Sequence, residues 1–140
     1  MRLDPFDYLE RLAGVRELIV GVGLTMMIIG HFLRVSAEMT AGRNFHHQVQ
    51  YRKSAKHELV VEGIYQISRH PSYLGWYIWA VGTQLMMMNF ISAVFFLITS
   101  WHFFNGRIKV EEELLHDFFG EAYVEYSKKV PIRIPFIKGY

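Results

Sequence analysis

Two side chains of opposite charge, Arg107 and Glu111, stand four positions apart just after a long uncharged stretch. Residues four apart meet on one face of a helix, so the spacing predicts an ion pair where a helix continues out of that stretch. Such a pair could bind a charged ligand, or it could be an ordinary surface contact of small energy. Glu112 and Glu113 follow at once, which also fits a solvated helix face. Spacing alone leaves both interpretations open.

A second polar cluster, Arg69-His70-Pro71, precedes another uncharged stretch. Proline is favoured at the first position of a helix, so Pro71 predicts a helix start. The free N–H groups and the positive dipole end of a helix N-terminus attract a carboxylate or a phosphate. The cluster therefore predicts either an anion-binding site or an ordinary anchor at a membrane interface.

Other kinds of site find little support in the sequence. The chain has no cysteine, which excludes disulfides, thiolate metal sites and a cysteine nucleophile. His46, His47 and His57 have no carboxylate at ligand spacing, and adjacent histidines do not point to one centre, so we expect no metal site. The sequence has no glycine-rich phosphate loop and no nucleophile elbow. A formal net charge of +2 is too small to indicate a nucleic-acid partner.

The elements that must position the two clusters are apolar helices. Hydrophobic residues make up 51% of the chain and charged residues only 20%, and charges are nearly absent from two windows. The first window, 18–37, is long enough to cross a bilayer core of about 30 Å. The second window, 71–104, exceeds one span but falls short of two, and it predicts a tight helical hairpin that turns at Asn89. Basic residues flank both windows, which is typical of the cytoplasmic side.

Polar segments complete the predicted fold. Segment 38–70 is too long for a simple turn and predicts a cytosolic loop, with an extended piece from Glu58 and a turn at Gly63. Segment 105–140 continues the second hairpin arm as an amphipathic helix, which Gly120 interrupts, and adds a short helix that Pro131 ends. The sequence thus predicts one domain, 1–140: an all-α, polytopic integral membrane protein with about three transmembrane helices.

The polar clusters also carry a family resemblance, which extends with intact spacing from Arg34 to the C-terminus. The residues that carry it are Asn44-Phe45, His47, Val49-Gln50, His57, Leu59-Val60, Gly63, Tyr65, Arg69-His70-Pro71-Ser72-Tyr73, Gly75-Trp76, Gly82-Thr83-Gln84, Phe103-Phe104, Arg107, Glu111-Glu112, Phe118-Phe119, Tyr126, Val130-Pro131 and Pro135-Phe136-Ile137. In these residues the chain resembles the isoprenylcysteine carboxyl methyltransferase family. It looks like a short form without the N-terminal transmembrane helices of typical eukaryotic members.

The resemblance implies an enzyme of the endoplasmic reticulum membrane whose active site faces the cytosol. Members of the family transfer a methyl group from S-adenosyl-L-methionine to the α-carboxylate of a C-terminal prenylated cysteine in processed CaaX proteins. The resemblance also implies that the cytosolic loop and the C-terminal helix form the cofactor site. The expected partners are therefore a prenylated cysteine and the lipid bilayer, and a homo-oligomer is left open.

The resemblance also assigns roles to individual residues. The expected cofactor-binding residues are Gln50, His57, Glu58, Leu59, Val60, Tyr65, His70, Pro71, Ser72, Tyr73 and Glu111. Arg107 matches the substrate-contacting arginine, and Arg69 is expected to support it in a catalytic set of Arg107, Glu111 and Arg69.

Two alternatives stay open from the sequence. The chain could be a related membrane methyltransferase that acts on another lipid-like acceptor, or a related membrane reductase. It could also be a catalytically silent, truncated membrane protein that pairs with a longer relative.

Overall fold

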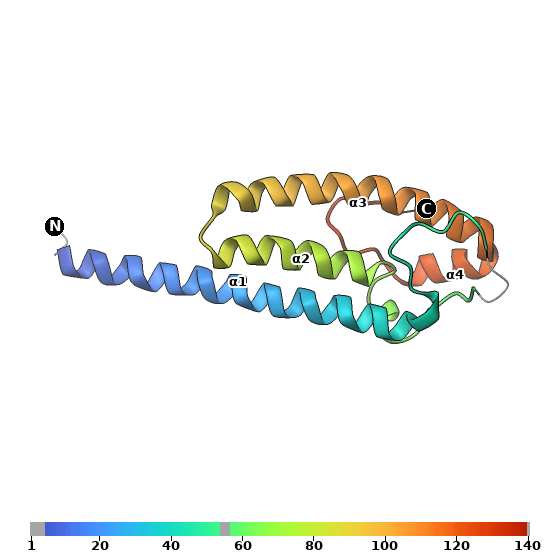
Figure 1. Cartoon of the computed structure of the whole chain (residues 1–140), viewed down its shortest axis with the longest axis horizontal. Coiled ribbons are helices and arrows are strands. Elements are labelled where there is room, and N and C mark those ends of the chain that lie inside the picture. The colour runs from blue at the N-terminus through green and yellow to red at the C-terminus, as the bar shows by residue number, and fades with distance from the viewer. Residues whose placement is uncertain (1–4, 54–56, 140) are drawn as a thin grey trace.

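A computed structural model describes residues 5–53 and 57–139, with backbone alone for 5–9. The element order is α1 (Pro5–Ala41), η1 (Gly42–Asn44), η2 (Gly63–Gln66), α2 (Pro71–Met86), α3 (Phe90–Phe119) and α4 (Glu121–Lys129). The described ranges contain helices and no strand, so the all-α prediction is confirmed. In Figure 1, α2 lies between α1 and α3, and α4 lies with the loops at the end of the molecule remote from the N-terminus.

The first helix is longer than the predicted window 18–37. α1 has 37 residues, which corresponds to about 55 Å at the rise of an α-helix. The prediction was too short because it followed the apolar run alone, whereas charged residues such as Glu10 and Arg11 are good helix formers and continue the same helix. The N-terminal part of α1 extends past the end of the α2–α3 hairpin (Figure 1).

Among the described residues, one helical stretch, Glu10–Asn44, is long and apolar enough to be a candidate membrane span. α2 has only 16 residues, fewer than the about 20 that cross a bilayer without thinning it. The predicted number of three spans therefore stays a prediction.

Glycines bring α1 and α2 into very close antiparallel contact. A Cβ atom on Gly30 would lie 2.5 Å from the carbonyl oxygen of Gly75, and one on Gly82 would lie 2.8 Å from the carbonyl oxygen of Gly23. Only residues without a side chain allow two helix backbones to approach so closely. The seam between α1 and α2 therefore depends on these two glycine pairs.

The hairpin turns where the sequence predicted it. After α2 the chain passes through Met87 and Met88, and Met88 has a positive φ of 58°. Asn89 then caps α3, because its side-chain oxygen accepts a hydrogen bond from the backbone N–H of Ser92 at 3.1 Å. The helix start at Pro71 and the break at Gly120, whose φ is 54°, are also confirmed.

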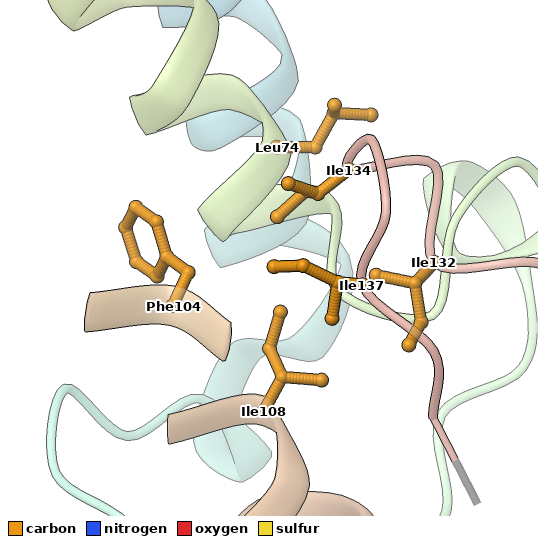
Figure 2. Close-up of a cluster of buried hydrophobic side chains, with 6 residues drawn as sticks. All are labelled: Leu74, Phe104, Ile108, Ile132, Ile134 and Ile137. Carbon is orange, nitrogen blue, oxygen red and sulfur yellow. The ribbon is translucent and has the colours of Figure 1, made fainter. Parts of the chain in front are cut away.

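The tail after α4 forms part of the core, which the sequence did not indicate. Ile132, Ile134 and Ile137 are almost completely buried. They pack against Leu74 of α2 and against Phe104 and Ile108 of α3, and Figure 2 shows the tail isoleucines pointing toward these helix residues. The tail thus ties both hairpin arms together at the end where α2 begins.

Candidate active site

A cavity lies where α1 ends and α2 begins, and it collects residues from four separate segments of the chain. Its lining comes from the loop after α1, from the turn at η2, from the start of α2 and from one face of α3. The lining residues are Asn44, Phe45, His46, Gln48, Val49, Gln50, His57, Tyr65, Arg69, His70, Pro71, Ser72, Tyr73, Glu111, Leu114, Leu115 and Phe118. Aromatic rings, aliphatic side chains and one partly buried carboxylate, that of Glu111, thus line the same space, which we call the polar-end cavity.

A second cavity adjoins the first, and we call it the aromatic cavity. It is lined by Arg34, Phe45, His46, His47, Ser72, Tyr73, Trp76, Phe96, Thr99, Ser100, Phe103, Phe104 and Arg107. Phe45, His46, Ser72 and Tyr73 belong to both linings, so these four residues form the wall between the cavities. The aromatic cavity is lined mainly by α2 and α3, and the loop residues Phe45, His46 and His47 complete its lining.

The predicted pair of Arg107 and Glu111 bridges the two cavities. Arg107 lines the aromatic cavity and Glu111 lines the polar-end cavity, and Nε of Arg107 lies 3.2 Å from Oε1 of Glu111. Tyr73 connects them, since its hydroxyl accepts from Nε of Arg107 at 2.7 Å and donates to the carboxylate of Glu111. Arg107 also donates to the backbone carbonyl of His47.

Glu111 is held in its ionised form. Burial alone would raise the pKa of Glu111, but the nearby His70, the hydrogen bond from Tyr73 and the charge of Arg107 lower it below its ordinary value. A negative charge is therefore present in the polar-end cavity at neutral pH, directly beside the positive charge of Arg107.

Behind this pair lies a second, fully buried carboxylate. Glu112 is only 1% exposed, and it accepts hydrogen bonds from Arg69 at 2.6 Å and 3.0 Å and from Nε2 of His70 at 2.8 Å. The hydroxyl of Tyr123 donates to it as well. Burial opposes ionisation, but these hydrogen bonds outweigh it and lower the pKa of Glu112 to about 2.

Comparison with known proteins identifies the family of the chain. The model of the isoprenylcysteine carboxyl methyltransferase family matches residues 22–117, which is more than half of the chain. The chain belongs to this family. It is 53% identical over 115 residues to protein-S-isoprenylcysteine O-methyltransferase B of Arabidopsis thaliana, a match that covers 82% of this chain and 58% of the relative.

Further relatives agree with this assignment. The human protein-S-isoprenylcysteine O-methyltransferase is 51% identical over 117 residues, which cover 84% of this chain and 41% of the relative. The solved structure of a eukaryotic intramembrane Ras methyltransferase, an isoprenylcysteine carboxyl methyltransferase, superposes with a TM-score of 0.85 at 45% identity and covers 88% of this chain and 44% of that one. The chain thus spans about half the length of the relatives it matches.

Most residues that the isoprenylcysteine carboxyl methyltransferase resemblance assigned to the cofactor come together in the structure. The polar-end cavity includes Gln50, His57, Tyr65, His70, Pro71, Ser72, Tyr73 and Glu111. Three assigned residues lie outside its lining. Glu58 is exposed and pairs with Arg43 at 3.3 Å, Leu59 packs against the buried cluster around Tyr123, and Val60 is half-buried beside it in the chain. The cofactor role of all the assigned residues stays a prediction.

Beside the polar-end cavity, the loop after α1 contacts the C-terminal end of α3. The ring of His57 packs edge-on against Phe118 and Phe119 with centroid distances of 5.9 Å and 5.4 Å. Nζ of Lys53 donates to the backbone carbonyl of Phe118 at 2.5 Å. His46 lies 6.2 Å from the ring of His57, and the part of the chain that the structure describes holds no group of three metal-ligating side chains. Residues 54–56 of the predicted loop 38–70 lie outside the described residues.

Arg69 lines the polar-end cavity, but its guanidinium points into the protein interior, toward Glu112. Besides its bonds to Glu112, it donates to the carbonyl of Ser127 at 2.9 Å and to the carbonyl of Val130 at 2.8 Å. These contacts tie the start of α2 to the end of α4. The structure thus places Arg69 where it can support the site, and its membership of the catalytic set stays a prediction.

The burial of Glu112 is the feature of the site that the sequence did not predict, because we took the acidic run after Glu111 as compatible with a solvated face. The spacing of apolar residues along α3 did indicate that Glu112 is buried. Phe104, Ile108 and Glu112 are spaced four apart and are all buried on the same face of α3. Two apolar residues at this spacing indicate that the next position on the stripe is also buried, whatever its charge.

Proposed function

We propose that the chain catalyses the S-adenosyl-L-methionine-dependent methylation of the C-terminal α-carboxylate of prenylated cysteine. The observation that carries the proposal is the bridge between the cavities, in which Glu111 faces one space and Arg107 the other. Methyl transfer needs the carboxylate oxygen in direct contact with the sulfonium methyl, so the two ligands must meet where the cavities adjoin, beside Ser72 and Tyr73. The names of the relatives, protein-S-isoprenylcysteine O-methyltransferases, support the same reaction.

The residues of the polar-end cavity fit the chemistry of S-adenosyl-L-methionine. Glu111 carries the negative charge that an ammonium group requires, and the N-terminus of α2 at Pro71 offers the positive dipole end that a carboxylate requires. Aromatic and aliphatic side chains such as Phe118 and Leu115 suit a purine ring. When bound, this cofactor supplies an electrophilic methyl group on a sulfonium sulfur.

The aromatic cavity fits a prenylated cysteine. Trp76, Phe103 and Phe104 provide apolar surface for an isoprenoid chain, while Arg107 provides a cation for the carboxylate. A C-terminal carboxylate has an ordinary pKa of about 3.5, so it is ionised at neutral pH and needs no general base. What the protein must supply is alignment of the carboxylate oxygen and exclusion of water, which are proximity effects.

The location of the reaction follows from the same arrangement. We infer that segments 38–70 and 105–140 face the cytosol, since basic residues flank the apolar windows, and that the hairpin 71–104 lies in the membrane of the endoplasmic reticulum. A prenyl chain would then stay in hydrocarbon while its carboxylate meets a cofactor that comes from the cytosol. We treat 1–140 as one functional domain, and assembly with a second copy stays a prediction.

The test is methyl transfer from labelled S-adenosyl-L-methionine to a farnesylcysteine analogue by the chain in detergent or lipid. We expect Arg107→Ala to lower the transfer rate by about 10²-fold, since the carboxylate loses its alignment. Cofactor binding should weaken less, because Arg107 lines only the aromatic cavity and reaches the other one through its bond to Glu111. We expect Glu111→Gln to weaken cofactor binding itself. Lys109→Ala, on an exposed position of the same helix, serves as the control and should behave as the unchanged chain.

The outcomes separate the alternatives. Binding of the cofactor without transfer to any prenylcysteine would point to another lipid-like acceptor. Failure of the unchanged chain to bind S-adenosyl-L-methionine would favour the silent membrane partner.

A further inference from the structure

Glu112 belongs to neither cavity lining, although it is the most heavily hydrogen-bonded carboxylate of the site. Its neighbour Glu111 faces the polar-end cavity, whereas Glu112 faces the interior between α3 and α4. A buried carboxylate that accepts bonds from several donors is expensive to assemble unless all of them are held in good geometry. Contact with the cofactor does not explain why Glu112 is buried with so many hydrogen bonds, because Glu112 reaches neither cavity.

His70 links the two glutamates. Its Nε2 lies 2.8 Å from Oε1 of Glu112, and its Nδ1 lies 3.6 Å from Oε2 of Glu111. Because a carboxylate faces each ring nitrogen, both nitrogens can carry a proton and each proton then has an acceptor on its own side. The side chain of His70 is only 5% exposed.

The contacts form a row of alternating charge. From the interior to the wall between the cavities the order is Arg69, Glu112, His70, Glu111 and Arg107. Each member is attracted to both of its neighbours when His70 is charged. If His70 were neutral, the two glutamates would still face one another across the ring, and the row would lose the attraction that holds Glu111 toward the interior.

We propose that Glu112 is a positioning residue of this site: it holds His70 charged and aimed at Glu111, and so holds Glu111 and Arg107 in place. The inference deepens the proposed function and rests on it for its link to catalysis. Glu112 does not touch either ligand cavity; it acts through His70.

The surroundings of His70 support a charged ring. The titratable and charged side chains that face it, directly or through one intermediate, are Glu111, Glu112, Arg69, Tyr73, Tyr123 and Arg107. Burial disfavours the charged imidazole, but the hydrogen bond to Glu112 and the charges of the two glutamates outweigh burial and raise the pKa of His70 above its ordinary value. Loss of either carboxylate would lower that pKa again, and the ring would become neutral at a lower pH.

A direct experiment reads the charge of His70 without any substrate. Two-bond nitrogen–proton NMR spectra of the full chain, labelled at its seven histidines, distinguish the imidazolium from the neutral tautomers, and His70→Gln assigns the signal. We expect His70 to be an imidazolium at about neutral pH in the unchanged chain and neutral in Glu112→Gln. A neutral His70 in the unchanged chain, or an unaltered charge in Glu112→Gln, would overturn the proposal.

Kinetics test whether the charge matters for the reaction. Between about pH 6 and about pH 8, kcat/KM for methyl transfer should be nearly constant in the unchanged chain and should fall by about ten-fold in Glu112→Gln as His70 loses its proton. Glu113→Gln is the matched control, because it removes the same charge from the exposed next residue. Glu112→Asp, which keeps the charge, should restore the flat profile. An equal loss at every pH in Glu112→Gln would mean a purely structural role and would sink the inference.

Two safeguards keep the outcome clear. If Glu112→Gln leaves Arg69 unpaired and does not fold, the double variant Arg69→Gln/Glu112→Gln replaces the ion pair by two amides and is measured in the same way. The NMR result on the unchanged chain decides the charge of His70 in every case. If that chain carries a charged His70 but neither binds S-adenosyl-L-methionine nor transfers methyl groups, the proposed function fails and the charge assignment stands.

Discussion

Glu111 and Glu112 show how strongly one step along a helix changes the situation of a side chain. Successive residues point about 100° apart around the axis, so one glutamate reaches the polar-end cavity while the next reaches the interior. Glu111 meets Tyr73 and Arg107 at the wall between the cavities, and Glu112 meets Arg69 and Tyr123 behind it. Two identical residues thus have different surroundings, a cavity for Glu111 and the interior for Glu112, because of direction alone.

The buried charge of Glu112 predicts a specific loss of stability in acid. Folding lowers the pKa of Glu112 from 4.5 to about 2. The contribution of this ionised carboxylate to the free energy of unfolding is therefore fully present above pH 4.5, and it is lost as the pH falls from 4.5 to about 2. The shift corresponds to a contribution on the order of 3 kcal/mol at neutral pH. We expect thermal unfolding temperatures of the unchanged chain in detergent to drop through this window.

Two variants check that the drop belongs to this residue. Glu112→Gln should start with a lower unfolding temperature at neutral pH but change less on acidification, since it has no carboxylate to protonate. Glu113→Gln should follow the unchanged chain. Equal acid slopes in all three proteins would assign the effect to other carboxyl groups.

At the scale of elements, the position of the site depends on how closely α1 approaches α2. The glycine pairs Gly30–Gly75 and Gly23–Gly82 allow backbone contact, and Arg34 of α1 then reaches Ser72 in the first turn of α2 at 3.5 Å. Both residues line the aromatic cavity. The seam between α1 and α2 therefore sets where one wall of that cavity stands.

We predict that Gly30→Ala destabilises the chain by about 1–3 kcal/mol. The added Cβ would lie 2.5 Å from the backbone of Gly75 and of Trp79, and backbone atoms cannot move aside as a flexible side chain can. Gly21→Ala is the matched control on the same helix, since a Cβ there meets nothing within 4 Å, and it should leave stability unchanged or raise it by up to about 1 kcal/mol. Thermal unfolding in detergent measures both, and equal effects would contradict a close-packed seam.

At the scale of the whole molecule, the C-terminal tail closes the structure around the site. Arg69 and Ser68 donate to carbonyls of the tail, with the hydroxyl of Ser68 at 2.6 Å from the oxygen of Ile132. Trp101 of α3 donates to the carbonyl of Pro135 at 2.7 Å. The tail therefore connects the chain that precedes α2 with the middle of α3, so that the two arms of the hairpin stay at a defined distance.

Alanine substitutions in the tail should separate its buried from its exposed face. Ile134→Ala removes a side chain that is only 3% exposed, so we expect a loss of about 2–5 kcal/mol in the free energy of unfolding. Phe136→Ala is the control two residues away, where the ring is 92% exposed, and it should leave the unfolding temperature nearly unchanged. A similar loss for both would contradict the core position of the tail, and methyl transfer should fall only for Ile134→Ala.

The helices themselves could be predicted from the sequence, because their signals are local. Pro71, Asn89 and Gly120 mark helix boundaries through their own backbone and capping chemistry, and the structure confirms each. The start of α1 was placed too late, since the apolar run does not coincide with the full helix. The family resemblance added the residues of the polar-end cavity, because it compares the whole pattern of residue types and spacings.

The sequence by itself determined the all-helical class, the hairpin, the family and the pairing of Arg107 with Glu111, all of which depend on neighbours in the chain or on the family pattern. Only the tertiary structure decided that Glu112 is buried, that glycines of α1 and α2 meet in register, that tail isoleucines complete the core and that the site divides into two cavities. These features join residues far apart in the chain, as Arg69 and Val130 show. Their geometry arises when several helices pack at once, and no local pattern of residue types specifies it.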